Sequence, residues 1–424
     1  MSLIYVHVFG CRSSLCEGEY IAGELLSLGH EVTEELSPEI NAAVIVTCSV
    51  TSEADRKCRQ LVRRVRKILG NNGVLAVCGC WSQGLDSQSA KAEGVDILAG
   101  SRGKSLVPSS VDKMMKEGRN FIDIRSSLSQ WEELPIASTV MHSRAFVKIQ
   151  DGCDHFCTYC VIPFLRGRPF SRPPENIIAE IERLISSGTK EIIFTGIHLG
   201  IYGREIGTSL AELVRKVSDI DGLTRLRLGS LEPFCLDDDL IDALAGSESF
   251  CHHIHLPLQS GDDEILKAMR RGYTSEEFVK VCEKARERIA DDIHISSDIL
   301  VGFPGEDDSA FSRTLDTMKA AGIARAHVFP YSPREGTLAA KMSGQIPKSV
   351  KISRTSEAIS LGRKLFADYA KIFVGKKNEV LIERDNKGYT RHYIEASCQG
   401  NDNEIVNAEV INFDGIKFEC MRRD

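Results

Sequence analysis

Three absences narrow the classes of protein to which this 424-residue chain can belong. No apolar run reaches the roughly 18 residues that a membrane-spanning helix needs. The N-terminus lacks the basic start of a secretory signal. Positive charge is not in excess either, because the formal net charge is -7, so any contact with nucleic acid requires local basic patches. We expect a cytoplasmic protein that uses no membrane partner.

Cysteine, in contrast, is abundant, with 14 residues in the chain. Disulfides seldom persist in a reducing cytosol, so this number indicates metal or redox chemistry, although several cysteines can be ordinary core residues. Hydrophobic residues make up 42% of the sequence, which is typical of a packed globular protein. A chain of this length predicts two or three domains.

One cysteine triplet has the most informative spacing. Cys153, Cys157 and Cys160 form a C-x3-C-x2-C motif that supplies three thiolates and no fourth. Iron-sulfur clusters are normally held by four cysteines, so a three-cysteine site leaves one iron open to a small molecule such as S-adenosylmethionine. The alternative is a structural zinc site with His155 as the fourth ligand. Zinc sites favour pairs of C-x2-C cysteines, and no such partner pair lies nearby.

Strand and helix patterns alternate along most of the chain, which is typical of parallel α/β folds. In the first part, predicted strands are residues 4–9, 43–47, 74–78 and 96–99, with helices at 17–28 and 53–69. In the second part, predicted strands are residues 145–149, 191–195, 225–228, 252–256, 293–301 and 326–329. Six such units predict a partial (β/α) barrel, whose site lies at the carboxyl ends of the strands, and Cys153 follows the first of them.

These patterns predict three domains. Residues 1–125 form a parallel α/β domain, residues 143–372 form the partial barrel and its helical tail, and residues 373–424 carry short strand patterns that indicate a small all-β domain. A poorly patterned linker at about residues 126–143 separates the first two.

A second set of cysteines follows strands of the first domain. Cys11, Cys48 and Cys80 each come directly after a predicted strand. The carboxyl ends of parallel strands meet at one edge of a sheet, so these residues can converge on a second three-cysteine site. Any one of them could instead be a small buried hydrophobic residue. Cys16 and Cys78 compete for the same role, but Cys78 lies within an apolar run and Cys16 at a helix start.

With these two cysteine sets and three predicted domains, the whole chain resembles the methylthiotransferases, a family of radical S-adenosylmethionine enzymes with a C-terminal TRAM domain. Further motifs at the predicted barrel rim agree with the resemblance: residues 195–200 (TGIHLG), 255–261 (HLPLQSG), 302–306 (GFPGE) and 329–332 (FPYS). The resemblance implies two 4Fe-4S clusters, one on each cysteine set, with S-adenosylmethionine bound at Cys153, Cys157 and Cys160. It also implies that Tyr159 lies near the adenine.

Several rim residues are candidates for binding this cofactor. Glycine lets the backbone approach a ligand closely, as expected at Gly302 and Gly305 and in the motif that contains Thr195 and Gly196. Gln259 and Ser260 can hydrogen-bond ribose hydroxyls or the methionine part. Taken alone, the Gly-Pro motif is also compatible with an ordinary turn.

The resemblance further implies a reaction and its partners. The first cluster would cleave S-adenosylmethionine with one electron from a donor such as flavodoxin or ferredoxin, and the second would hold the sulfur; the sulfur donor stays unknown. Many family members have Asn where Ser14 and Thr47 stand here. These replacements change the side chains that can hydrogen-bond around the second cluster. The alternative to an enzyme is a non-enzymatic iron-sulfur sensor that uses the same cysteine ligands.

The substrate implied by the resemblance is the anticodon stem-loop of tRNA. Residues 195–203 resemble the branch that acts on threonylcarbamoyladenosine, ahead of isopentenyladenosine in tRNA and an aspartate of a ribosomal protein. The threonyl carboxylate requires a cationic partner, for which Arg166, Arg168 and Arg204 are candidates. A run of basic residues at 56–67, interpreted either as a phosphate-binding surface or as a solvated helix face, offers local positive charge.

Overall fold

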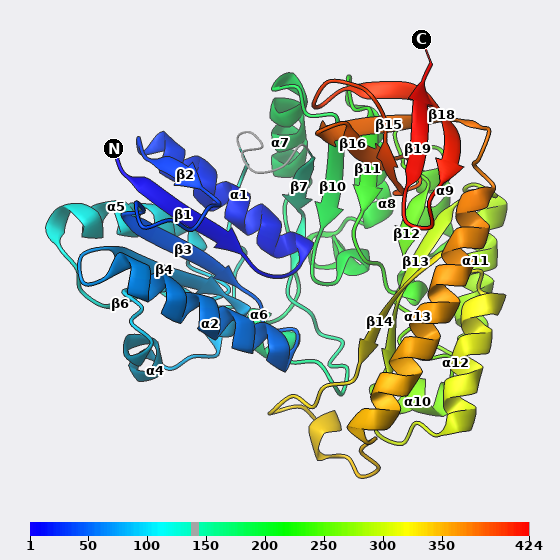
Figure 1. Ribbon diagram of the computed structural model, residues 1–424, viewed down its shortest axis with the longest axis horizontal. Helices are drawn as coiled ribbons and strands as arrows, with labels where there is room; N and C mark the ends of the chain where they lie inside the picture. The colour runs from blue at the N-terminus through cyan, green and yellow to red at the C-terminus, as the bar shows by residue number, and fades with distance from the viewer. Residues whose placement is uncertain (137–143, 424) are drawn as a thin grey trace.

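The computed structural model describes residues 1–136 and 144–423 (Figure 1). Part of the predicted linker, and residue 143, where the predicted central domain begins, lie outside the described residues. The fold class expected from the sequence is confirmed, since a parallel α/β domain, a partial barrel and a small closed β-barrel follow one another along the chain. The exact domain boundaries stay predictions.

The N-terminal domain is built on a six-stranded parallel sheet of order β2-β1-β3-β4-β5-β6. Two layers of helices cover it, because β3 and β4 are buried on both faces. Residues of α1 and α5 pack on one face, and residues of α2 and α4 on the other. The elements are β1 Leu3–Val8, α1 Arg12–Ser27, β2 Glu31–Thr33, β3 Ala42–Thr47, α2 Ser52–Leu69, β4 Val74–Gly79, α3 Cys80–Gln83, α4 Ser87–Ala92, β5 Ile97–Leu98, α5 Val107–Glu117 and β6 Ile122–Asp123.

The central domain is an open barrel of six parallel strands. Its strands form two sheets, β11-β10-β7 and β12-β13-β14, and isolated bridges from Leu226 to Phe250 and from Ser230 to His255 join them. All six predicted strands are confirmed: β7 Ala145–Lys148, β10 Glu191–Thr195, β11 Arg225–Leu228, β12 His253–His255, β13 His294–Val301 and β14 Arg325–Pro330. The outer strands β7 and β14 do not pair with each other in the described part of the chain. The barrel is therefore open on one side.

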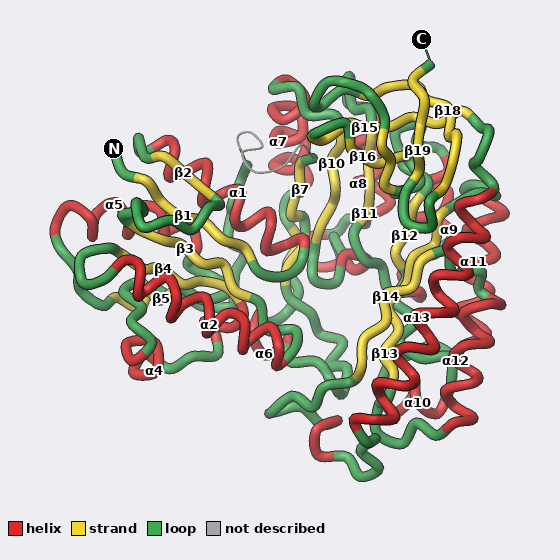
Figure 2. Tube along the Cα trace, in the orientation of Figure 1, coloured by secondary structure: helices red, strands yellow, loops and turns green. Residues whose placement is uncertain are grey.

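Helices cover the outside of this barrel, as Figure 2 shows for α11, α12 and α13 beside β13 and β14. The helices of the central domain are α6 Ile162–Arg166, α7 Pro174–Ser186, α8 Leu210–Ser218, α9 Asp238–Ala245, α10 Asp263–Met269, α11 Ser275–Arg288, α12 Asp308–Ala320 and α13 Lys348–Lys371. Of these, α6 lies against α3 of the N-terminal domain. A short antiparallel pair, β8 Gln150–Asp151 and β9 Phe170–Ser171, follows β7. This pair brackets the segment that carries the cysteine triplet.

The C-terminal strands close into a small barrel of order β15-β16-β17-β19-β18. They are β15 Lys377–Arg384, β16 Lys387–Thr390, β17 Glu395–Ser397, β18 Ile405–Phe413 and β19 Phe418–Arg422. This barrel contacts the central one through two buried arginines of β11. Arg225 donates to the carbonyl of Tyr389 at 2.9 Å, and Arg227 donates to the carbonyl of Thr390 at 2.7 Å. Arg227 also pairs with Glu191 at 2.8 Å, so its charge is compensated.

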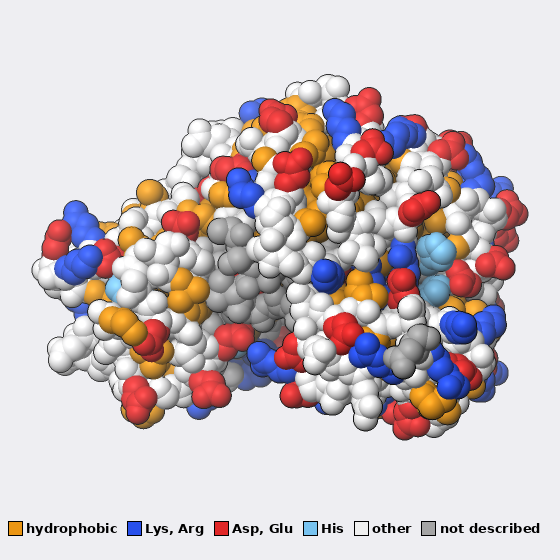
Figure 3. Space-filling view, turned by 90° about the horizontal axis from the view of Figure 1, so that it is seen from above, with side chains coloured by type: hydrophobic (Ala, Val, Ile, Leu, Met, Phe, Trp, Pro, Cys, Tyr) orange, Lys and Arg blue, Asp and Glu red, His pale blue; other side chains and the backbone are white. Residues whose placement is uncertain are grey.

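Two observations concern the surface. Among the described residues, no helix is both long and apolar enough to cross a bilayer. Acidic and basic side chains are interspersed on the face seen in Figure 3, without a single continuous basic region.

Candidate functional site

The two α/β domains direct the carboxyl ends of their strands toward a shared region. In Figure 1 the arrowheads of β3 and β4 point toward α6, which lies just after the cysteine triplet. Cys11 follows β1, Cys48 follows β3, and Cys80 begins α3 directly after β4. The triplet follows β8 on the central domain. Both cysteine sets thus occupy the strand ends at which α/β folds bind ligands.

The structure brings Cys11, Cys48 and Cys80 together. Burial raises the pKa of the Cys48 thiol to about 11, and the neighbouring Cys11 and Cys80 thiols raise it further. Burial also raises the pKa of Cys80, which Cys11 likewise affects. Gly10, with φ of +116°, makes the approach possible, because a Cβ atom there would lie 2.8 Å from the Cβ of Cys48. A side chain at position 10 would push the first cysteine away from the second.

The structure also places the two competing cysteines, and Ser14 and Thr47, which stand where many family members have Asn. Cys16 and Cys78 are 1% and 0% exposed and belong to hydrophobic clusters. The Ser14 hydroxyl lies 3.7 Å from the Cys11 sulfur, which makes Ser14 a neighbour of this thiol. The Thr47 hydroxyl instead donates to the carbonyl of Cys78 at 2.6 Å, so it holds β3 against β4.

Cys153, Cys157 and Cys160 also lie close together. Burial raises the pKa of Cys153 to about 11 and that of Cys160 to about 12, and in both cases the charge of Cys157 raises it further. A cation faces this group, since Arg271 donates to the Cys157 sulfur at 3.3 Å. Arg271 is held by an ion pair with Glu232 and by the Tyr273 hydroxyl at 3.2 Å. Sequence reasoning missed Arg271, because nothing local in the sequence marks it.

Tyr159 connects the triplet to two other motifs. Its ring packs edge-on against Phe303 with centroids 6.4 Å apart, and Phe303 packs against Tyr331 at 5.5 Å. Phe303 lies between Gly302 and Gly305, whose φ angles of +74° and +88° favour glycine. The Gly302 amide donates to the Glu306 carboxylate at 2.9 Å. The loop of residues 302–306 therefore forms a wall beside Tyr159.

The motif at residues 195–200 lies between the two cysteine sets. The Gln150 side-chain oxygen accepts hydrogen bonds from the amides of Ile197 at 2.9 Å and His198 at 2.8 Å. A Cβ atom at Gly196 would lie 2.9 Å from the same oxygen, so glycine is required for this contact. The His198 ring contacts the Cys153 sulfur at 3.8 Å. The Thr195 hydroxyl lies 3.4 Å from that of Ser13 on α1, which links the two domains.

Gln259 and Ser260 differ in how they are placed. Gln259 has a left-handed backbone with φ of 62°, and its backbone amide donates to the carbonyl of Asp298 at 2.8 Å. Ser260 is 1% exposed, lies 3.4 Å from the Thr314 hydroxyl and accepts from the Asp262 amide at 3.2 Å. A role in cofactor binding stays a prediction for both residues, and the Ser260 hydroxyl already has protein partners.

Arg166 is a correction to the sequence analysis. It was a candidate partner for a substrate carboxylate, but it is fully buried and donates to the Cys80 sulfur at 3.1 Å. It also pairs with Glu17 at 2.9 Å and Asp151 at 3.1 Å, two carboxylates that sequence reasoning missed. Arg168 and Arg204 are exposed. Arg168 lies 4.8 Å from the ring centre of Phe170.

The basic run on α2 is also largely paired. Arg56 binds Glu53, Arg59 and Arg63 bind Glu93, and Arg66 binds Asp96. These ion pairs favour the interpretation of α2 as a solvated helix face.

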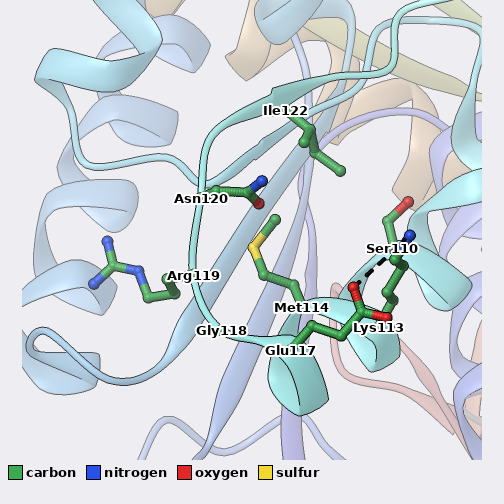
Figure 4. A pocket seen from close by; sticks show the side chains of 8 residues that line it. All are labelled: Ser110, Lys113, Met114, Glu117, Gly118, Arg119, Asn120 and Ile122. Carbon is green, nitrogen blue, oxygen red and sulfur yellow. Dashed lines mark ion pairs between the residues drawn. The ribbon is translucent and has the colours of Figure 1, made fainter.

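One surface pocket has no relation to these sites. A cavity of about 480 Å³ at the end of α5 is lined by Lys113, Glu117, Arg119 and neighbouring residues (Figure 4). None of the predicted site residues lines it.

Comparison with known proteins agrees with this architecture. Residues 147–318 match the Radical SAM superfamily, and residues 3–100 match Uncharacterized protein family UPF0004. The chain is 33% identical over 418 residues to "Threonylcarbamoyladenosine tRNA methylthiotransferase MtaB" of Bacillus subtilis (strain 168), covering 96% of this chain and 92% of that protein. It is also 33% identical over 426 residues to "tRNA-2-methylthio-N(6)-dimethylallyladenosine synthase" of Syntrophotalea carbinolica, covering 98% of this chain and 94% of that protein.

A solved structure shares the fold. The radical S-adenosylmethionine methyltransferase TsrM from Kitasatospora setae, with cobalamin and a [4Fe-4S] cluster bound, aligns with a TM-score of 0.56 at 15% identity. The alignment covers 80% of this chain and 74% of that chain.

Proposed function

Because the chain belongs to the radical S-adenosylmethionine tRNA methylthiotransferases, we propose that its substrate is threonylcarbamoyladenosine beside the tRNA anticodon. The product carries a methylthio group at carbon 2 of this adenine. The protein is a transferase that uses two 4Fe-4S clusters and S-adenosylmethionine. Membership of this enzyme family excludes the alternative of a non-enzymatic iron-sulfur sensor.

The proposal assigns one cluster to Cys153, Cys157 and Cys160 and the other to Cys11, Cys48 and Cys80. All six thiols are free of disulfides, and the chemistry of both donor sets fits iron. A buried thiolate without a metal is costly, and the raised pKa values of Cys48, Cys153 and Cys160 express that cost. A bound cluster would remove this cost, because iron would replace the proton on each of these thiols. When bound, the clusters supply the electron for cleavage of S-adenosylmethionine and the site for the transferred sulfur.

The protein's own residues bind and orient the reactants. Tyr159, backed by the buried ring of Phe303, supplies an aromatic wall for the cofactor, and the exposed Gly305 leaves open backbone beside it. Arg271 and Arg166 each donate a hydrogen bond to one cysteine sulfur of a set. Such hydrogen bonds tune the reduction potential of a cluster.

One observation supports a reaction that uses both cysteine sites. Arg166 lies six residues after Cys160 and donates to the sulfur of Cys80, so one side chain ties the triplet segment to the second cysteine set. A reaction that moves sulfur from one site to a carbon activated at the other requires this proximity. The expected partners are tRNA and an electron donor such as flavodoxin or ferredoxin.

The choice between the tRNA substrates rests on residues 195–203. The experiment is to incubate the reconstituted enzyme with anticodon stem-loops that carry either threonylcarbamoyladenosine or isopentenyladenosine, and to analyse the nucleosides by mass spectrometry. We expect a methylthio product from the first stem-loop. Product from the isopentenyl stem-loop alone would assign the chain to that branch. Product from neither would favour the ribosomal-protein substrate.

A further inference from the structure

A small cavity of about 210 Å³ lies inside the open barrel, where all three domains contribute side chains. Its lining comes from α1 of the N-terminal domain, from three central strands and from the C-terminal barrel. The lining residues are Arg12, His253, His255, Ser296, Arg325, His327, Tyr389 and Tyr393. Apart from the aromatic rings, this lining is polar.

The cavity is positively charged. Arg12 and Arg325 form no ion pair within residues 1–136 and 144–423, although each contacts an aromatic ring. The charges of these arginines affect the pKa values of neighbouring side chains. Burial lowers the pKa of His327, and both arginines lower it further. Arg12 also lowers the pKa of Tyr393 against the effect of burial. The carboxylate of Asp298, further along β13 from Ser296, is already engaged by His255 at 3.4 Å.

The cavity adjoins the second cysteine set. Arg12 directly follows Cys11, and its guanidinium donates to the carbonyl of Leu228 at 3.4 Å and lies 5.5 Å from the ring centre of Tyr393. It therefore extends from the Cys11 segment into the barrel. His327 on β14 is exposed, so the cavity is reached from the open side of the barrel.

We propose that this cavity binds the carboxylate of the threonylcarbamoyl group, with Arg12 and Arg325 as its cationic partners. The inference rests on the proposed function and names the residues that set its specificity. Arginine is suited to this task, because its planar guanidinium can bind a carboxylate through two hydrogen bonds. The histidine rings and tyrosine hydroxyls can hydrogen-bond the remaining polar atoms of the substituent.

The size and charge of the cavity favour the threonylcarbamoyl group over a whole small molecule, an isopentenyl group or a backbone phosphate. At about 210 Å³ it is smaller than the roughly 300–1,000 Å³ of pockets that enclose whole small molecules. An isopentenyl group has no polar atom to offer two half-buried arginines, so it would leave them unpaired and desolvated. A backbone phosphate is attached to the outside of a stem-loop, whereas these arginines line the interior of a barrel.

The test compares binding of three stem-loops to the cluster-loaded protein by fluorescence anisotropy at one fixed salt concentration. The stem-loops carry threonylcarbamoyladenosine, its methyl ester or isopentenyladenosine. We expect the acid to bind roughly tenfold tighter than the ester, as charged hydrogen bonds predict. Arg325→Gln should abolish this ratio, and Arg12→Lys and Arg325→Lys should reduce it. Arg363→Gln, which removes an exposed arginine of α13, is the matched control and should retain it. Iron content checks that each variant is loaded.

The outcomes separate the two proposals. If the wild-type protein modifies the threonylcarbamoyl stem-loop but Arg325→Gln and Arg12→Lys both keep the ratio between acid and ester, the cavity is not the carboxylate site, while the proposed function stands. Equal weakening of all three stem-loops by Arg325→Gln would mean a phosphate contact and would also overturn the inference. If the wild-type protein modifies only the isopentenyl stem-loop, the proposed function itself fails.

Discussion

Arg166 donates a hydrogen bond from its Nε atom to the sulfur of Cys80 at 3.1 Å, across the boundary between the N-terminal and central domains. Its other donors bind Glu17 of α1 and Asp151 of β8. Lys104 and Lys148 join this buried group by pairing with Glu17 at 3.2 and 2.9 Å, and Arg102 joins it by pairing with Asp151. The relative position of the two cysteine sets therefore depends on a charged network that water does not reach.

Replacing Arg166 should destabilise the protein. Arg166→Gln removes one partner of a buried ion pair, a change that costs on the order of 3 kcal/mol, with the remaining lysines limiting the loss. The measurement is urea unfolding of the cluster-loaded protein. Arg168→Gln, two residues away and exposed, is the control and should change the free energy of unfolding by no more than about 0.5 kcal/mol. Equal stability of the two variants would contradict a structural role for the network.

The two cysteine sets should be separable by substitution. Replacing Cys153, Cys157 and Cys160 with Ala should remove half of the iron and end cleavage of S-adenosylmethionine. Replacing Cys11, Cys48 and Cys80 should also remove half of the iron and end methylthiolation, but leave cleavage intact. Iron analysis and detection of 5′-deoxyadenosine measure both effects. A second triple variant that kept all its iron would show that Cys11, Cys48 and Cys80 are not ligands.

Gly196 should be sensitive to the smallest side chain. In Gly196→Ala the new Cβ would lie 2.9 Å from the Gln150 oxygen that holds the amides of Ile197 and His198. We expect the loop to shift and methylthiolation to fall by tenfold or more, since misplacement of this kind can cost about 100-fold. Gly23→Ala is the control for an added methyl group alone, because a Cβ atom there would meet nothing within 4 Å and its backbone, like that of Gly196, is not left-handed. Similar activity of both variants would argue against the Gln150 contact.

Stability should fall as the pH drops below about 6.5, the ordinary pKa of histidine. Burial lowers the pKa of His294 to about 3, so the folded protein keeps it neutral while the unfolded chain takes up a proton. The unfolded state then binds more protons, and stability is lost progressively between about pH 6.5 and pH 3. His294→Asn should reduce the slope of unfolding free energy against pH over this window. Urea unfolding at pH 7 and pH 5 tests this, and an unchanged slope would exclude His294 as a main contributor.

The sequence alone predicted the architecture, which the structure confirms, and it was sufficient to group the cysteines of the two proposed sites. Period-2 and period-3.6 patterns are local, so all six strands of the central barrel could be predicted. The Cys153 triplet is also local, because its three residues lie within one loop. Cys11, Cys48 and Cys80 could be grouped without a structure, since the carboxyl ends of parallel strands share one edge. Short edge strands such as β2 and β6 escaped prediction, because two or three residues carry no clear period.

Only the tertiary structure determined the roles of the charged residues. The sequence offers no way to distinguish Arg166 from Arg168 as candidate partners of a substrate carboxylate. In the structure Arg166 is buried against Cys80, whereas Arg168 is exposed. Arg271 contacts Cys157 although 114 positions separate them, and Arg12 meets Tyr393 from the opposite end of the chain. The reason is physical. Strand and helix periods follow from local burial, whereas the partner of a charged side chain depends on which distant segments fold against it and on how much water they exclude.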